Sequence, residues 1–251
     1  MTIPISHFCE KARWALDRAG LPYVEERHIQ VIHVFAARWA GGGRTVPVLV
    51  TESGTVLADS TDILRWADAY VPSHLRLYPD GGLGAEAAAL ETRFDDQLGP
   101  DGRLWMYQET LPVVNDLTPW ALAGVPGWER GAFRVAGPAV DAVIRHYLGV
   151  DATAADAALD RVEREFDDIA ARLSDGRRFL LGDRFTAADL TFAALAAPML
   201  LPTLYGSPLP PPEAMPETAA RVIRRLREHP AGVFADRVYR EERIRPATNG
   251  Q

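Results

Sequence analysis

The chain has 251 residues, a net charge of −7, 47% hydrophobic residues and 24% charged residues. This is the balance of an ordinary globular protein, long enough for two packed domains, and it excludes disorder as the main state. The negative charge and the lack of a Lys/Arg run interleaved with aromatic residues argue against nucleic acid as a partner.

Cysteine content and hydropathy bear on disulfides, metal sites and cellular location. The single cysteine, Cys9, excludes an internal disulfide, and no Cys/His group has zinc-ligand spacing, so we expect no metal. The longest apolar stretch, 190–201, is interrupted by Thr191 and Pro198 and is too short to cross a bilayer. The residues after Met1 lack the pattern of a secretory signal. We therefore expect a cytoplasmic protein with no membrane partner.

The first part of the chain alternates short β-like runs with helical runs. Apolar residues at helical spacing predict a helix over 7–19, closed by Gly20 with Pro22 just beyond. Only residues 1–5 offer a strand before the helix, and Pro4 cannot donate a hydrogen bond to a sheet. We therefore expect a first strand that is short or truncated.

Further short elements follow before residue 75. They are predicted, in chain order, as strand 23–29, helix 31–39, strand 46–50, a returning strand from Val56, and a helix that opens at Asp59 and Ser60. A Ser-Gly turn separates the last two strands, which predicts an antiparallel hairpin.

Beyond a linker over 73–83, rich in Pro and Gly, only helices are expected. They are predicted near 84–98, 104–114, 133–148, 154–173, 186–201 and 216–228. The clearest is 154–173, in which five apolar residues form one stripe. Thr186 and Asp189 form a capping box at the start of another. These patterns together predict a second, all-helical domain over 84–245.

Ser6 lies at the mouth of the first predicted helix, where unpaired amides and the helix dipole favour negative charge. A hydroxyl that donates a hydrogen bond there stabilises a thiolate. Lowering a thiol pKa of about 8.5 by two units requires roughly 2.7 kcal/mol, and a hydrogen bond to a charged acceptor supplies much of it. The alternative is that Ser6 only caps the helix and Cys9 packs as a small hydrophobe.

Residues 4–16, PISHFCEKARWAL, resemble the catalytic opening of bacterial glutathione transferases. The resemblance places Ser6 where the family has its thiol-activating Ser or nucleophilic Cys. It places Cys9 at the second position of a glutaredoxin-like pair. Pro47, within TVPVL at 45–49, matches the family's cis-proline position, which implies that Val46 offers its backbone to an extended tripeptide. A trans proline at the start of an edge strand is the alternative.

Two further features resemble the way the family binds glutathione. Arg44 is placed to approach a ligand carboxylate, with a solvated side chain as the equal alternative. Asp59 and Ser60 resemble the acid–Ser pair that holds the γ-glutamyl end, although simple N-capping explains the same residues.

The resemblance implies a thioredoxin-like, glutathione-binding domain over 1–75, a helical-bundle domain over 84–245, and a homodimer. It also implies an enzyme that uses glutathione as co-substrate and conjugates its thiolate to a small electrophile in detoxification. Phe8, Trp105 and Tyr107 are the candidate substrate-binding residues, with core packing as the alternative around Trp105. Two other functions stay open: thiol–disulfide exchange by Cys9, and a non-catalytic interaction protein with this fold.

Overall fold

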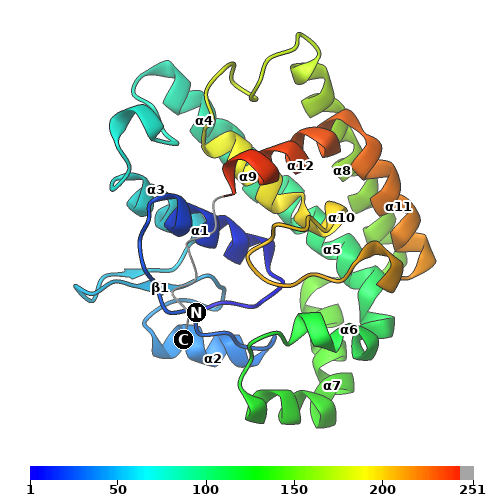
Figure 1. Cartoon of the computed structure of the whole chain (residues 1–251). Helices are drawn as coiled ribbons and strands as arrows, with labels where there is room; N and C mark the ends of the chain where they lie inside the picture. Colours follow the sequence, from blue (N-terminus) through cyan, green and yellow to red (C-terminus); the bar gives the residue numbers. More distant parts are fainter. Residues whose placement is uncertain (244–251) are drawn as a thin grey trace.

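Helix α1 (His7–Arg18) begins where the Ser6 side chain accepts a hydrogen bond from the backbone N–H of Cys9, at 3.4 Å. Helix α1 confirms the helix predicted over 7–19. The computed structural model describes residues 1–243, and in it α1 lies between a small sheet and the helical half of the molecule (Figure 1). The helix packs against α3 on one side and α9 on the other, so it belongs to the contact between the two halves.

The strand predicted over 23–29 does not form. Only Arg27 pairs there, in an isolated parallel bridge with Thr2 whose two hydrogen bonds are both 2.9 Å long. The prediction is wrong because a strand needs a partner of similar length. The partner here is cut short by Pro4 and by the start of α1, so one bridge is all the pairing it offers.

The first two residues nevertheless lie inside the sheet. Thr2 faces Arg27 on one side, while Met1 and Val48 exchange hydrogen bonds of 2.7 and 3.1 Å on the other. Strands β1 (Leu49–Val50) and β2 (Val56–Leu57) then form the predicted antiparallel hairpin. The result is a thioredoxin-like half with short strands, as expected.

Two helices complete this half. Helix α2 is Ile32–Trp39, and α3 is Ser60–Asp68. Asp59 caps α3 by accepting a hydrogen bond from the backbone N–H of Thr61 at 2.8 Å. In α3, the apolar residues Ile63, Leu64 and Ala67 are buried.

The rest of the described chain is helical. Its main elements are α4 (Gly82–Arg93), a π-helical segment (Phe94–Leu98), α5 (Gly99–Thr110), α6 (Val114–Ala121), α7 (Gly127–Leu148), α8 (Ala152–Leu173), α9 (Ala187–Leu195), α10 (Ala197–Leu200), α11 (Glu217–Glu228) and α12 (Pro230–Glu242). Helices α6 and α12 are not among the predicted ones, and α7 begins earlier than predicted. The predicted domain end at residue 245 lies outside the described residues.

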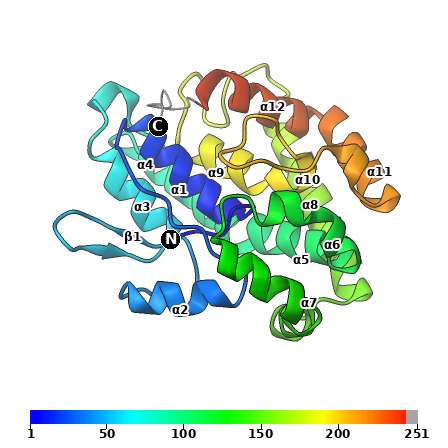
Figure 2. The ribbon, with the colours of Figure 1, turned by 60° about the horizontal axis from the view of Figure 1, so that its bottom comes forward.

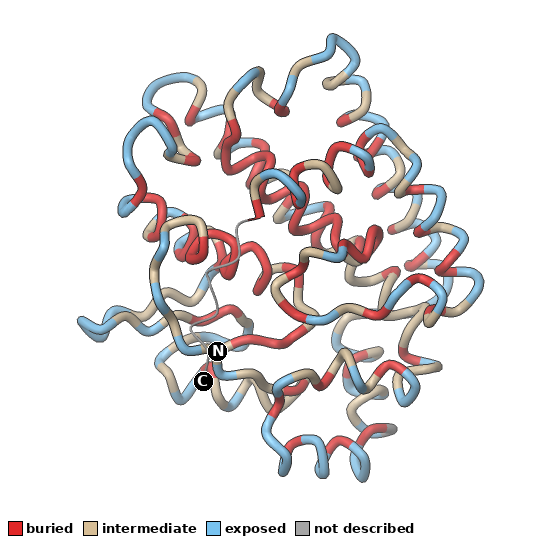
Figure 3. The backbone as a smooth tube through the Cα atoms, viewed as in Figure 1, coloured by how far each residue is buried: buried red, intermediate tan, exposed pale blue. Residues whose placement is uncertain are grey.

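The core runs through both halves. Every residue of α9 is buried, and the buried segments of α1 and α9 lie close together in Figure 3. The capping box at the start of α9 forms as predicted, with the Asp189 carboxylate accepting a hydrogen bond from Thr186 N at 2.8 Å and another from Leu180 N at 2.7 Å. Among residues 1–243, no helix combines the length and apolarity needed to cross a membrane.

Candidate functional site

A cavity of about 490 Å3 lies between the two halves. One wall comes from the start of α1, from α2 and from the loop before β1, and the other from α5, α6, α7 and the segment 197–215. Figure 2 shows α2 and α7 side by side on this face of the molecule. Five predicted site residues line the cavity: Ser6, Phe8, Arg44, Val46 and Tyr107.

Ser6 stands at the cavity with its hydroxyl oxygen already accepting from Cys9 N. Accepting this bond does not use the hydroxyl proton, which can turn toward the Cys9 sulfur or into the cavity. The N-terminus of α1 adds positive potential at the same point. A thiolate placed beside Ser6 would therefore receive a hydrogen bond and a favourable dipole.

Cys9 lies one turn further along α1 and is fully buried. Its pKa is raised, chiefly because burial disfavours the thiolate, although the nearby Arg13 guanidinium and the hydrogen bond with Ser6 act in the opposite direction. The structure does not bring Cys9 to the cavity, and its thiol stays protonated at neutral pH.

The loop before β1 presents backbone to the cavity. The Val46–Pro47 peptide bond is cis. Val46 lines the cavity, whereas Pro47 is buried and does not line it. Within the described part of the chain, the backbone N–H and C=O of Val46 have no partner. They are free to pair with an extended ligand. Arg44 is exposed at the rim.

The structure does not bring Asp59, Ser60 or Trp105 to the cavity. Asp59 is exposed and its carboxylate caps α3, while Ser60 is buried at the first position of that helix. Trp105 is 3% exposed and belongs to the main core, whereas Tyr107, two positions on, faces the cavity.

Two charged or titratable residues that the sequence did not single out shape the site. Lys11 is fully buried, and its Nζ lies 2.7 Å from Glu91, 2.6 Å from Asp95 and 2.9 Å from Thr61 Oγ1. It thereby holds the start of α3 against α1 and α4. His7 lines the cavity, and its Nε2 lies 3.0 Å from the carbonyl oxygen of Gly99. Their partners lie far away in the sequence, so no local pattern indicates either role.

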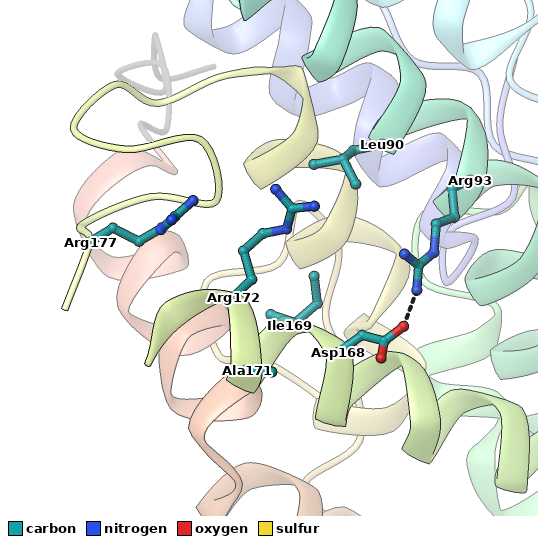
Figure 4. Close-up of a pocket in the computed structure, with 7 residues that line it drawn as sticks. All are labelled: Leu90, Arg93, Asp168, Ile169, Ala171, Arg172 and Arg177. Carbon is teal, nitrogen blue, oxygen red and sulfur yellow. Dashed lines mark hydrogen bonds and ion pairs between the residues drawn. The ribbon is translucent and has the colours of Figure 1, made fainter. Parts of the chain in front are cut away.

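A second hollow, of about 380 Å3, lies between α4 and α8 (Figure 4). Its three arginines each already pair with a carboxylate: Arg93 with Glu165 and Asp168, Arg172 with Glu86, and Arg177 with Asp175. It therefore has no uncommitted charge to offer a ligand, and the cavity beside Ser6 is the better candidate.

Comparison with protein families assigns both halves. Residues 1–74 match the model described as "Glutathione S-transferase, N-terminal domain", and residues 152–229 match that described as "Glutathione S-transferase, C-terminal domain". The chain belongs to the glutathione S-transferase family. Among curated protein sequences, no match to this chain is found.

Solved structures show the same fold at low sequence identity. A glutathione S-transferase of Ceriporiopsis subvermispora in complex with glutathione is 17% identical, with a TM-score of 0.62, and the match covers 96% of this chain and 92% of that one. One from Xanthobacter autotrophicus is 18% identical, with a TM-score of 0.60 and coverage of 97% and 93%. One from Methylobacillus flagellatus with GSH bound is 14% identical, with a TM-score of 0.58 and 95% coverage of each chain.

The apolar wall of the cavity comes largely from a region that neither family model covers. Both α6 and α7 fall between the matched ranges 1–74 and 152–229. They contribute apolar side chains, among them Leu117, Trp120, Phe133, Val140 and Ile144. Tyr107 adds a hydroxyl that lies 3.4 Å from the Gln30 side-chain nitrogen. This transferase-family chain therefore combines a polar wall near Ser6 with a broad apolar wall.

Proposed function

We propose that this chain is a cytoplasmic glutathione transferase that conjugates glutathione to a small, apolar electrophile. The observation that carries the proposal is the position of Ser6. Its hydroxyl, whose proton is not used by the bond from Cys9 N, stands at the N-terminus of α1 and opens on a cavity whose other wall is apolar. Glutathione-bound structures of the same fold add support from relatives.

The chain's own residues supply binding and charge stabilisation. Val46 pairs through its free backbone groups with the cysteinyl part of glutathione, and Arg44 meets a carboxylate at the rim. Asp59 and Ser60, at the start of α3, lie outside the cavity lining, so the γ-glutamyl end that we assign to them would extend beyond the cavity. Once the glutathione thiol has lost its proton to solvent, the Ser6 hydroxyl donates a hydrogen bond to the sulfur, which favours the thiolate at neutral pH.

Glutathione supplies the nucleophile in this chemistry: the thiolate electron pair forms a C–S bond, and the electrophile either loses its leaving group or takes up a proton. The apolar wall excludes water from the reacting pair and holds the electrophile against the sulfur. A cavity of about 490 Å3 suits a small molecule.

A glutathione-affinity column followed by an aryl-halide conjugation assay tests the proposal. Retention together with conjugation would support it. Retention with disulfide reduction but no conjugation would contradict it in favour of redox chemistry, and Cys9→Ala would then have to abolish that activity. Absence of retention would leave a glutathione S-transferase fold without glutathione binding, which also contradicts the proposal.

A further inference from the structure

The α6–α7 lobe, residues 114–148, joins the main core through α6, where Leu117 lies in that core and Trp120 packs against it. Its other buried apolar side chains belong to two small clusters separate from the main core. Leu122, Val125 and Phe133 form one cluster with Ile29 of the N-terminal half. A second cluster joins Ile144 to residues flanking the lobe. Because satellite clusters bury less apolar surface than a main core, polar links to the N-terminal half contribute a larger share of what holds the lobe in place.

One such link is Glu129, whose side chain is fully buried in the first turn of α7. Its Oε1 lies 2.7 Å from His28 Nδ1, and its Oε2 accepts a hydrogen bond from the backbone N–H of Ile29 at 2.9 Å. Both partners precede α2 directly. A single carboxylate thus uses both oxygens to fasten the lobe to the segment that leads into α2, and a buried carboxylate that loses such partners is strongly disfavoured.

The same segment contains a strained residue. Val31 has φ of 74°, in the region that β-branched residues rarely adopt. Such a conformation persists only where its surroundings fix it. The three residues directly before it are linked to the opposite wall, from His28 and Ile29 to Glu129 and from Gln30 to Tyr107. The direction in which α2 starts therefore depends on these contacts.

The lobe and α2 bear facing parts of the cavity. Val34 and Phe35 line it from α2, and Phe133 and Ile144 line it from α7. The thiol side is fixed independently, because Val48 exchanges hydrogen bonds with Met1 next to the Val46 loop. Loss of the Glu129 link would therefore disturb the electrophile side far more than the thiol side.

We propose that Glu129 is a positioning residue that sets the separation of α2 and the α6–α7 lobe and so shapes the electrophile half of the cavity. The inference rests on the proposed function only for its kinetic readout. Binding of anilinonaphthalene sulfonate, a fluorescent probe of apolar surfaces, reports on the same half without any turnover.

The test compares Glu129→Ala with Glu165→Ala. Glu165 is a matched control: a glutamate 5% exposed, on α8, that pairs with Arg93 and does not line the cavity. We expect Glu129→Ala to raise both the probe Kd and the KM for the aryl halide by about fivefold to tenfold, with the glutathione Kd changed less than about twofold. Glu165→Ala should change none of them. Glu129→Gln, whose amide oxygen still accepts from Ile29 N, should restore most of the probe affinity.

Hydrogen exchange of the Ile29 amide verifies the link itself, since Glu129→Ala should accelerate that amide and Glu165→Ala should not. Equal probe affinity in the two alanine variants would overturn the proposal, as would an Ile29 amide that exchanges equally fast in the wild type and in Glu129→Ala. If the wild type lacks conjugation, the proposed function fails while the probe comparison still decides this inference. If Glu129→Ala does not fold, His28→Gln removes one of the two contacts and the same comparison is made with it.

Discussion

The first turn of α1 buries two side chains that often titrate near neutral pH. His7 is enclosed against Gly99 and Phe8, and burial lowers its pKa to about 3, with the Arg103 charge acting in the same direction. Cys9 is buried and its pKa is raised. Both are therefore uncharged at neutral pH, so within this turn of α1 the Ser6 hydroxyl and the helix N-terminus are the groups that favour a thiolate.

The buried, neutral His7 should make stability fall in acid. The unfolded chain binds a proton at His7 near pH 6.5, whereas the folded chain binds it only near pH 3. The stability that His7 contributes is therefore complete above pH 6.5 and is lost as the pH falls toward 3. Between pH 7 and pH 5 the loss is about 2 kcal/mol. His7→Gln keeps a donor for Gly99 and does not titrate, so urea unfolding at the two pH values should show a smaller loss. The same loss in both proteins would contradict this.

Cys9→Ala should leave conjugation within about twofold of the wild type and lower the free energy of unfolding by about 1 kcal/mol, because it removes a buried sulfur and no reacting group. Aryl-halide turnover and urea unfolding measure the two effects. Loss of turnover in a variant that remains folded would assign the chemistry to Cys9.

At the scale of elements, α1 and α5 approach closely at Gly99. A Cβ placed on Gly99 would lie 2.6 Å from Phe8 Cζ and 3.3 Å from Leu195 Cδ1. Helix propensity favours alanine over glycine by about 1 kcal/mol, whereas overpacking costs about 1 to 3 kcal/mol. We expect the overpacking cost to be the larger, because 2.6 Å lies well inside van der Waals contact and the Phe8 ring, which lines the cavity, would have to move.

Gly99→Ala is therefore expected to lower the free energy of unfolding by about 1 kcal/mol and to weaken binding of anilinonaphthalene sulfonate. Gly131→Ala on α7 is the matched control, since a Cβ there meets nothing within 4 Å. That change should be neutral or stabilising in the same urea titration. A stabilised Gly99→Ala variant would show that the two helices are less closely packed than described.

Local patterns predict the elements whose causes are local. The cap at Ser6, the stripe on α8 and the capping box before α9 are all readable within about twenty residues. The strand over 23–29 fails because its pairing depends on Thr2. Helix α6 escapes prediction because Pro119 lies inside it, and α12 because it starts at Pro230.

The same distinction applies to the site. Ser6 and Val46 could be found because they belong to short motifs. Neighbouring residues in the 105–107 segment point in different directions, since each helical step turns by about 100°, so the pattern could not tell Trp105 in the core from Tyr107 at the cavity. Glu129 has no local signal at all, because its partner His28 lies 101 residues away.

At the scale of the whole molecule, one core joins both halves. Trp14 of α1 packs against Tyr239 of α12 with ring centroids 4.7 Å apart, and Arg243 reaches back to Glu10 and Asp17. The cavity is formed between halves that are fixed to each other in this way, which suits a site that must hold two substrates in register.

We further predict that the 27.6 kDa chain forms a homodimer, as the family resemblance implies. Sedimentation at micromolar concentration should give particles of twice the chain mass. Dilution should shift the distribution toward monomer if the association is reversible. Particles of only the single-chain mass at micromolar concentration would contradict the dimer.

The most direct test of the central claim measures the pKa of the glutathione thiol while it is bound. Ultraviolet absorbance of the thiolate, followed across pH in the complex, should give a pKa about two units below the ordinary value in the wild type. In Ser6→Ala the pKa should return toward that ordinary value, with conjugation at neutral pH reduced about tenfold to a hundredfold and glutathione affinity changed much less. Equal thiol pKa values in the two proteins would contradict the role of Ser6.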